Sequence, residues 1–262
     1  MDLQLVGKVA LVTAASKGLG KASACQLARE GAHVVMCARS DALETAASEI
    51  QGESSSEVVP VRADVTVQAN IERMVHRTVD QFGRIDILVE NTGGPTPGNF
   101  LDLSLSDWEE GIQLTLMSVV RLCYEVIPLI LGQGSGNIIA IESISVRQPI
   151  DKLILSNSMR MAVIGLLKSI ANEFGPQGIR INTINPTFTW TERVEQLLKN
   201  RAADRGTDIA QEAEVIAATI PLRRMGDVEE FGRAVAWLAS PASSYIHGHG
   251  LMFDGGATRS SI

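Results

Sequence analysis

The amino-acid sequence predicts an α/β protein built on a single parallel, doubly wound β-sheet with helices on both faces. Two observations support this fold class. Seven short runs rich in β-branched residues alternate with longer segments of helical period, the pattern of parallel strands joined by helical crossovers. The 262 residues are also 45% hydrophobic, enough to fill a substantial core. Right-handed crossovers then place helices on both sides of the sheet.

The first two runs, "KVALVTA" and "HVVMCA", enclose a glycine-containing turn and an amphipathic helix closed by Gly31. Five further runs follow at similar spacing. The seven predicted strands span residues 8–14, 33–38, 57–63, 86–91, 136–143, 179–185 and 250–256. The polar stretch "QGESSSE" at 51–57 is the only candidate boundary, and it is too short to separate domains. We therefore expect one domain over residues 1–262.

The segment 187–222 differs from the rest of the chain. It is long, charged and placed between the sixth predicted strand and the final helix, and "NRAADRGTDIAQEAEVIAATI" within it has partly helical character. Segments in this position cover ligand sites in many enzymes. The sequence therefore predicts a mobile lid on the substrate side.

Charge argues against two classes of partner. The net charge of −7 argues against a protein that binds nucleic acid or an anionic membrane, because such proteins normally have a basic stripe. A small-molecule substrate fits better. The N-terminal apolar run is only about six residues long and follows no basic segment, so we expect no signal peptide, no membrane span and a cytoplasmic location.

The cysteines and histidines indicate neither disulfides nor a metal. Cys25, Cys37 and Cys123 are odd in number and form no CxxC pair, which predicts buried free thiols. His247 and His249 share one strand face but have no third ligand nearby. No metal is expected.

The turn after the first strand has the context of a dinucleotide-binding fingerprint, strand–turn–helix–strand. Gly18 and Gly20 let the backbone approach a pyrophosphate, and the helix that begins there offers free N–H groups to it. Further contacts are expected from Thr13, Ser16, Lys17 and Leu19. Ala14 stands where a first glycine is usual, which costs roughly 1 kcal/mol if its φ is positive. The alternative is a tight turn that uses glycine for structure alone.

The end of the second strand favours NADP(H) over NAD(H). An NAD-binding site places an acidic residue there to bind the ribose, but this chain has Ala38 followed by Arg39. Arg39 would bind a 2′-phosphate bidentately, with Lys17 as a second cation. The alternative interpretation is that Arg39 is a solvated loop residue.

Several motifs in the same order resemble the short-chain dehydrogenase/reductase family along the whole chain. They are "TAASKGLG", "ADVT", "FGRIDILVENTGG", "GIRINTINPTFTWT" and "LMFDGG". The resemblance implies a Rossmann-type sheet of strand order 3-2-1-4-5-6-7. It also implies a homotetramer, and the apolar helix at 158–174 has more apolar positions than a one-sided stripe needs.

The resemblance also assigns cofactor contacts outside the turn. Those it implies are Asp64 and Val65 at the adenine, Asn91 and Gly93 in the cleft, and Pro186 and Thr191 at the nicotinamide carboxamide. Two positions depart from the family pattern. Glu90 stands where an asparagine is usual and Thr187 where a glycine is usual.

The catalytic positions depart further. The family uses Asn, Ser and a Tyr followed four residues later by Lys, with the Tyr as proton donor and the Lys lowering its pKa. Counted back from "VIGLLKSIANEFGP", the Tyr position is Ser156 and the Lys position is Arg160. Ser143 matches the family serine, and Thr115 stands at the Asn position. Only Ser143 has the expected side chain.

This substitution changes what the pocket can do. A serine is a far weaker acid than a phenol of pKa about 10, and arginine, with a pKa above about 12, is no base near neutrality. On a helix Ser156 and Arg160 share one face. With Ser143 they would stabilise an oxyanion while water delivers the proton, which predicts an NADP(H)-dependent oxidoreductase for a carbonyl/alcohol pair. In a variant of this hypothesis Arg160 binds a substrate carboxylate.

Two other functions stay open. Ser156 and Arg160 would satisfy one another in an inactive pocket if the chain is an NADP(H)-binding sensor or a partner subunit. Lyase chemistry is the third hypothesis, because halohydrin dehalogenases resemble this family and have Arg at the Lys position. Those enzymes keep the Tyr and lose the glycine-rich turn, whereas this chain does the reverse.

Overall fold

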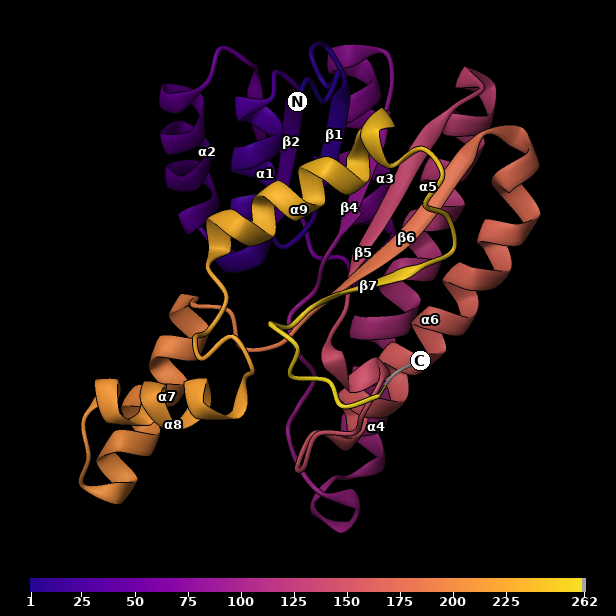
Figure 1. Cartoon of the computed structure of the whole chain (residues 1–262). Helices are drawn as coiled ribbons and strands as arrows, with labels where there is room; N and C mark the ends of the chain where they lie inside the picture. The colour runs from indigo at the N-terminus through magenta and orange to yellow at the C-terminus, as the bar shows by residue number, and fades with distance from the viewer. Residues whose placement is uncertain (261–262) are drawn as a thin grey trace.

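Seven parallel strands form the central sheet of the computed structural model, which describes residues 1–260 (Figure 1). Their order is β3-β2-β1-β4-β5-β6-β7, so the predicted fold class and strand order are confirmed. The strands are β1 (Val9–Val12), β2 (His33–Ala38), β3 (Val58–Arg62), β4 (Ile87–Glu90), β5 (Gly136–Ile141), β6 (Ile179–Pro186) and β7 (Gly250–Phe253). Each strand lies inside the apolar run that predicted it, except β6, which extends one residue beyond its run.

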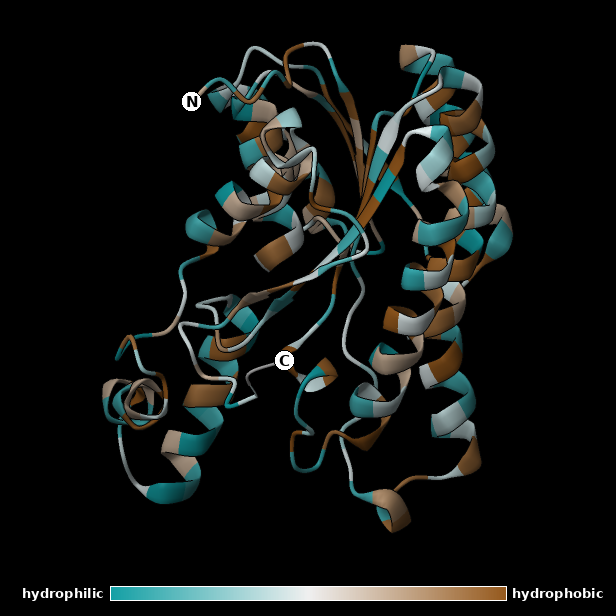
Figure 2. Cartoon of the chain, turned by 45° about the vertical axis from the view of Figure 1, so that its right-hand side comes forward, coloured by the Kyte–Doolittle hydropathy of each residue, from teal (hydrophilic) through white to brown (hydrophobic). Residues whose placement is uncertain are grey.

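Alternate residues of the strands face opposite helical layers. Ala10 and Val12 of β1 belong to one buried cluster, and Leu11 between them belongs to another, as the period of a strand requires. One layer holds α1 (Gly18–Arg29), α2 (Ala42–Glu53) and α9 (Val228–Ala239), and the other holds α3 (Gln68–Phe82), α5 (Ser118–Gln133) and α6 (Ile154–Phe174). Figure 2 shows apolar residues concentrated in the sheet between these layers.

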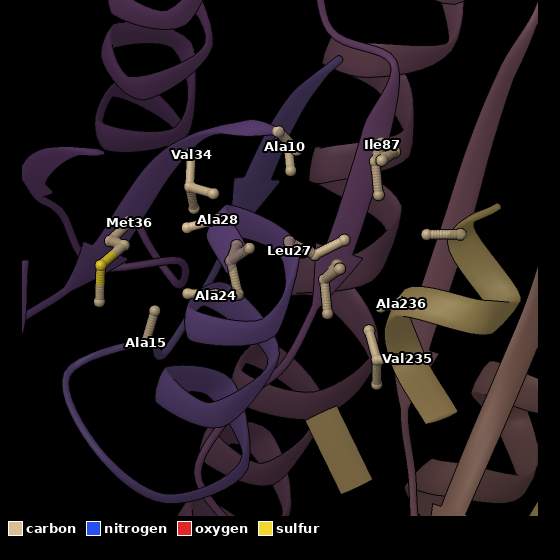
Figure 3. Close-up of a cluster of buried hydrophobic side chains, with 14 of the residues drawn as sticks. Ala10, Ala15, Ala24, Leu27, Ala28, Val34, Met36, Ile87, Val235 and Ala236 are labelled. Atoms are coloured by element: carbon tan, nitrogen blue, oxygen red, sulfur yellow. The ribbon is translucent and has the colours of Figure 1, made fainter. Parts of the chain in front are cut away.

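The layer of α1 packs closely on the sheet and on α9. Figure 3 shows Leu27 of α1 among the buried side chains of the first cluster; full burial of a leucine stabilises the fold by about 1.5–3 kcal/mol. Gly232 of α9 allows the two helices to approach, because a Cβ there would lie 2.6 Å from the carbonyl oxygen of Ala22. This contact sets the close packing of α1 against α9.

The strand order creates a topological switch point at β1. β1 pairs with β2 on one side and with β4 on the other, so chain connections leave in opposite directions at that point. Open α/β sheets bind ligands at the carboxyl ends of the strands beside such a switch point. The turn after β1 and the segments after β4, β5 and β6 all begin at this edge of the sheet.

The predicted lid segment 187–222 contains a helical pair, α7 (Glu192–Arg205) and α8 (Ile209–Thr219). These helices project from the sheet at the lower left of Figure 1. Leu198, Ile216 and Ile220 form a small buried cluster of their own between them. The pair therefore packs largely as a separate unit joined to the sheet by two chain segments.

The remaining helical segments are short or interrupted. They are η1 (Phe100–Asp102), α4 (Leu105–Gly111), the π-helical η2 (Ile112–Met117), η3 (Ile144–Val146), η4 (Gly175–Gln177) and η5 (Pro241–Ser243). The continuous helix Leu105–Gln133 and the helix Ile154–Gln177 are long and apolar enough to cross a membrane by length and composition alone. Both contribute buried side chains to the core of this fold, which accounts for their apolar character.

Candidate active site

The turn between β1 and α1 forms a narrow backbone cradle. Ala14 has a φ of 47°, so the alanine does occupy a left-handed conformation that favours glycine. Gly18 has a φ of 57°. A Cβ at Gly20 would lie 2.4 Å from the carbonyl oxygen of Ala14, so a side chain there would collide with the backbone. The turn therefore requires glycine at Gly20 and favours it at Gly18.

The first turn of α1 is open to an anion. Lys17 is the N-cap, and its side chain makes no capping hydrogen bond, so free backbone N–H groups point outward from Gly18, Leu19 and Gly20. Helix N-termini with this geometry bind phosphate groups. The cradle therefore fits the diphosphate of a dinucleotide.

Thr13 and Asn91 tie the cradle to the sheet. The Thr13 hydroxyl donates to the Asn91 carbonyl at 2.8 Å and accepts from the Asn91 N–H at 2.8 Å. Thr13 is fully buried, so its only proton is used inside the protein. Thr13 was expected to donate to the cofactor; instead it links β1 to the residue after β4. Asn91 also donates from Nδ2 to the Ala14 carbonyl at 3.5 Å.

The expected adenosine contacts gather at the ends of β2 and β3. Arg39 is 71% exposed, and its Nη1 lies 3.5 Å from Oδ2 of Asp64. Asp64 accepts from the N–H and hydroxyl of Thr66 at 2.9 and 2.8 Å. Burial raises the pKa of Asp64, but the Thr66 hydrogen bonds and the Arg39 charge outweigh it and hold that pKa below its usual value. Asp64 is thus a carboxylate that orients Arg39.

The other predicted residues of this side lie nearby. The Ser40 hydroxyl donates to the Ser16 hydroxyl at 3.2 Å, which places Ser16 beside the end of β2. Lys17 is exposed and Val65 is buried. Arg39 and Lys17 therefore present two cations near the turn.

Pro186 and Thr191 connect the sheet to the lid. Pro186 ends β6 and is buried. Thr191 caps α7 by accepting from the Val194 N–H at 3.3 Å. The Thr191 methyl group would lie 3.5 Å from a Cβ at Gly18, so the start of the lid packs against the glycine-rich turn. Gly93 is exposed, with open space around it.

Ser143 and Ser156 differ in their exposure and in their hydrogen bonds. Ser143 is partly exposed just after β5, where its hydroxyl accepts the N–H of Ser145 at 3.2 Å. Ser156 is 9% exposed in the first turns of α6, and its oxygen accepts from Arg160 Nε at 3.1 Å. The expected helical face shared by Ser156 and Arg160 is confirmed.

Arg160 itself points into the protein. It is 8% exposed, and its Nη1 donates to Glu142 Oε2 at 2.9 Å and to the Ile141 carbonyl at 3.2 Å. Its charge is therefore already paired. The hypothesis that Arg160 binds a substrate carboxylate does not fit this geometry, because that carboxylate would have to displace a buried ion pair.

Thr115 is buried as well. It lies in the π-helical segment, is 1% exposed, and its hydroxyl has no hydrogen-bond partner among the described residues. Such π-helical insertions occur often at functional sites. Thr115 is nevertheless almost fully buried, so its predicted catalytic role stays a prediction.

Sequence reasoning missed the two acidic residues beneath this site. Glu90 was noted only as a departure from the family pattern, and Glu142, next to Ser143, was not singled out. Both are buried. Burial and the charge of Glu142 raise the pKa of Glu90 well above its usual value, although Arg160 opposes this. The available signal was a glutamate at the end of two apolar strands, where a buried charge needs a partner.

The comparisons with known proteins agree with this geometry. The family model described as Enoyl-(Acyl carrier protein) reductase matches residues 13–258. Oxidoreductase UcpA of Salmonella typhimurium is 35% identical over 256 residues, which cover 97% of this chain and 96% of that protein. The chain belongs to the short-chain dehydrogenase/reductase family.

Other short-chain dehydrogenases/reductases match over similar lengths. D-threitol dehydrogenase of Mycolicibacterium smegmatis is 31% identical, over 98% of this chain and 95% of that protein. The crystal structure of L-sorbose reductase from Gluconobacter frateurii, complexed with NADPH and L-sorbose, superposes with a TM-score of 0.96 at 30% identity and covers 99% of this chain and 100% of that one. The relatives named here are oxidoreductases, which supports an enzyme over a binding protein without turnover.

Proposed function

We propose that the chain is an NADP(H)-dependent oxidoreductase that acts on the carbonyl/alcohol pair of a small metabolite. The observation that carries this proposal is the hydrogen bond from Arg160 to Ser156 at the position where the family keeps its proton donor. The bond gives the serine hydroxyl a fixed cationic neighbour. Ser156 can then act on a carbonyl oxygen without being an acid.

The cofactor part of the proposal rests on the cradle and on two cations. Gly18 and Gly20 would hold the diphosphate, while Arg39 and Lys17 would bind the 2′-phosphate that distinguishes NADP(H). The NADPH named in the L-sorbose reductase structure supports this preference. When bound, the dinucleotide supplies or accepts the hydride.

The chain's own contribution is electrostatic. Because Arg160 Nε occupies an acceptor site of Ser156 Oγ, the Ser156 proton is free to point toward the cleft. It would donate to the substrate carbonyl, with Ser143 as a second hydroxyl. Charge that develops on the oxygen during hydride addition is stabilised by these donors and, through Ser156, by the guanidinium. Water would deliver the proton that completes the alcohol.

Binding and turnover test this proposal separately. NADPH and NADH are titrated by fluorescence, and NADPH oxidation is then followed with ketoses, ketones, aldehydes and keto acids, including L-sorbose. We expect tighter binding of NADPH and turnover of at least one carbonyl compound. Ser156→Ala should lower kcat by roughly 10²- to 10³-fold with little change in NADPH binding. Tight NADPH binding with no turnover across the panel would instead support the inactive sensor or partner subunit.

The assembly belongs to the same proposal. Met161 and Tyr124 are exposed on the long helices α6 and α5, where a second copy would cover them. We expect a homotetramer, measured by light scattering coupled to gel filtration. A monomer at micromolar concentration would contradict this part of the proposal alone.

A further inference from the structure

A buried charge cluster lies beneath Ser156. In a parallel sheet, paired residues and residues two apart on a strand face the same side. Glu90 at the end of β4 pairs with Ala140 of β5, and Glu142 follows two residues later. The two carboxyl groups therefore face the same helical layer, that of α5 and α6 (Figure 1). Arg160 enters from α6 and binds Glu142 at 2.9 Å.

The cluster contains two carboxyl groups but one guanidinium. Glu142 and Arg160 neutralise each other, and both side chains are at most 9% exposed. Glu90 is 2% exposed, and its Oε1 has no hydrogen-bond partner among the described residues. An unpaired buried carboxylate is very unfavourable, so such a group takes a proton instead.

Burial and the charge of Glu142 favour the protonated form of Glu90, and Arg160 opposes them. Glu142 comes from the end of β5 and Arg160 from α6. The thiol of Cys123 from α5 also faces Glu90, which raises the pKa of that thiol. Burial and the nearby glutamate raise the pKa of Cys123 to about 12, so this thiol is neutral. Arg160 is the sole cation of the group, and it is already bonded to Glu142. Glu90 therefore has no cation of its own.

We propose that Glu90 and Glu142 are positioning residues for Ser156. Glu90 holds a proton, which leaves Arg160 to Glu142 alone, and Glu142 in turn holds the guanidinium where its Nε reaches Ser156. Once the pH rises far enough for Glu90 to ionise, a second carboxylate competes for Arg160 and draws it from the serine. The catalytic consequence rests on the proposed function, whereas the proton on Glu90 does not.

The proton is tested by unfolding, without any substrate. Urea unfolding of the wild-type chain and of Glu90→Gln is measured from pH 5 to pH 9. Because Glu90 keeps its proton in the folded chain but loses it in the unfolded chain, a rise in pH should destabilise the wild type relative to the variant. The ratio of unfolded to folded wild-type chain should rise by up to about tenfold per pH unit relative to the variant. Glu212→Gln is the matched control, because Glu212 is equally buried but accepts from Arg205 and Thr207. Glu212→Gln should not gain stability over the wild type as the pH rises.

Positioning is tested by kinetics and by structure. Glu142→Gln should lower kcat by about tenfold or more with KM within about twofold, because the loss is felt in the transition state. Glu142→Asp should restore part of the rate. Glu90→Gln should shift the alkaline limb of the kcat/KM pH profile to higher pH, because the glutamine cannot ionise and compete for Arg160. A crystal structure of Glu142→Gln should show Arg160 moved away from Ser156.

The outcomes separate this inference from the proposed function. Identical pH dependence of unfolding in the wild type and Glu90→Gln would overturn the proton on Glu90. An Arg160–Ser156 contact unchanged in Glu142→Gln would overturn the positioning of Ser156 by Glu142. Absence of turnover in the wild-type chain would defeat the proposed function only. The unfolding and crystallographic comparisons would still decide the proton on Glu90 and the positioning of Ser156.

Discussion

Arg160 donates from Nε to Ser156 over 3.1 Å while its Nη1 is bonded to Glu142 at 2.9 Å. One guanidinium thus serves a hydroxyl at the cleft and a carboxylate in the core. The planar fork of arginine makes both contacts possible in one orientation, which a lysine ammonium would not reproduce. The arginine at this position is therefore part of a bonded unit rather than a free cation of the pocket.

Removing one member of this unit should be far worse than removing both charges. Arg160→Met leaves Glu142 buried without its partner and should lower the free energy of unfolding by about 3–5 kcal/mol. The double variant with Glu142→Gln removes the unpaired charge and should recover much of that loss. Denaturant titration of both single variants and the double variant measures the coupling. Additive effects would contradict a direct, buried ion pair.

Ala14→Gly should stabilise the chain. Ala14 adopts a φ of 47°, a conformation that is unfavourable by roughly 1 kcal/mol for alanine and free of that strain for glycine. We expect a gain of about 0.5–1 kcal/mol in unfolding free energy, reduced somewhat by the greater freedom of glycine in the unfolded chain. Ala15→Gly is the control, since Ala15 is fully buried and has no positive φ, and it should destabilise. A loss of stability in Ala14→Gly would contradict the strain.

The strands were predictable because burial on both faces leaves a plain apolar run, and the turn because its glycines stand between a strand and a helix. Ser156 and Arg160 were predictable as neighbours because helical spacing is local. The Arg160–Glu142 pair was not, since it joins residues 18 apart in sequence whose meeting depends on how α6 packs against the sheet. The role of Thr13 was missed for a similar reason: its partner, Asn91, is 78 residues away.

Gly20→Ala should damage the cofactor site directly. The added methyl group would lie 2.4 Å from the Ala14 carbonyl and 2.9 Å from Nδ2 of Asn91, so the turn must move away from the helix N-terminus. We expect NADPH affinity to fall by roughly tenfold or more, because phosphate binding depends on those N–H groups. Gly52→Ala in α2 is the matched control, with no atom within 4 Å of the new Cβ. It should leave binding unchanged and stabilise the helix by about 0.5–1 kcal/mol.

Arg39→Ala should remove the preference for NADPH. Arg39 is exposed and held by Asp64 rather than by a buried network, so its loss should affect stability by less than about 1 kcal/mol. Its guanidinium is the group placed to bind a 2′-phosphate, and loss of one such charge-assisted contact is worth roughly 1.5–3 kcal/mol. Fluorescence titration should therefore show NADPH affinity falling about tenfold to a hundredfold while NADH affinity stays within about twofold. An equal loss for both dinucleotides would mean that Arg39 supports the fold of the site, and an unchanged NADPH affinity would mean that it is the solvated loop residue of the alternative interpretation.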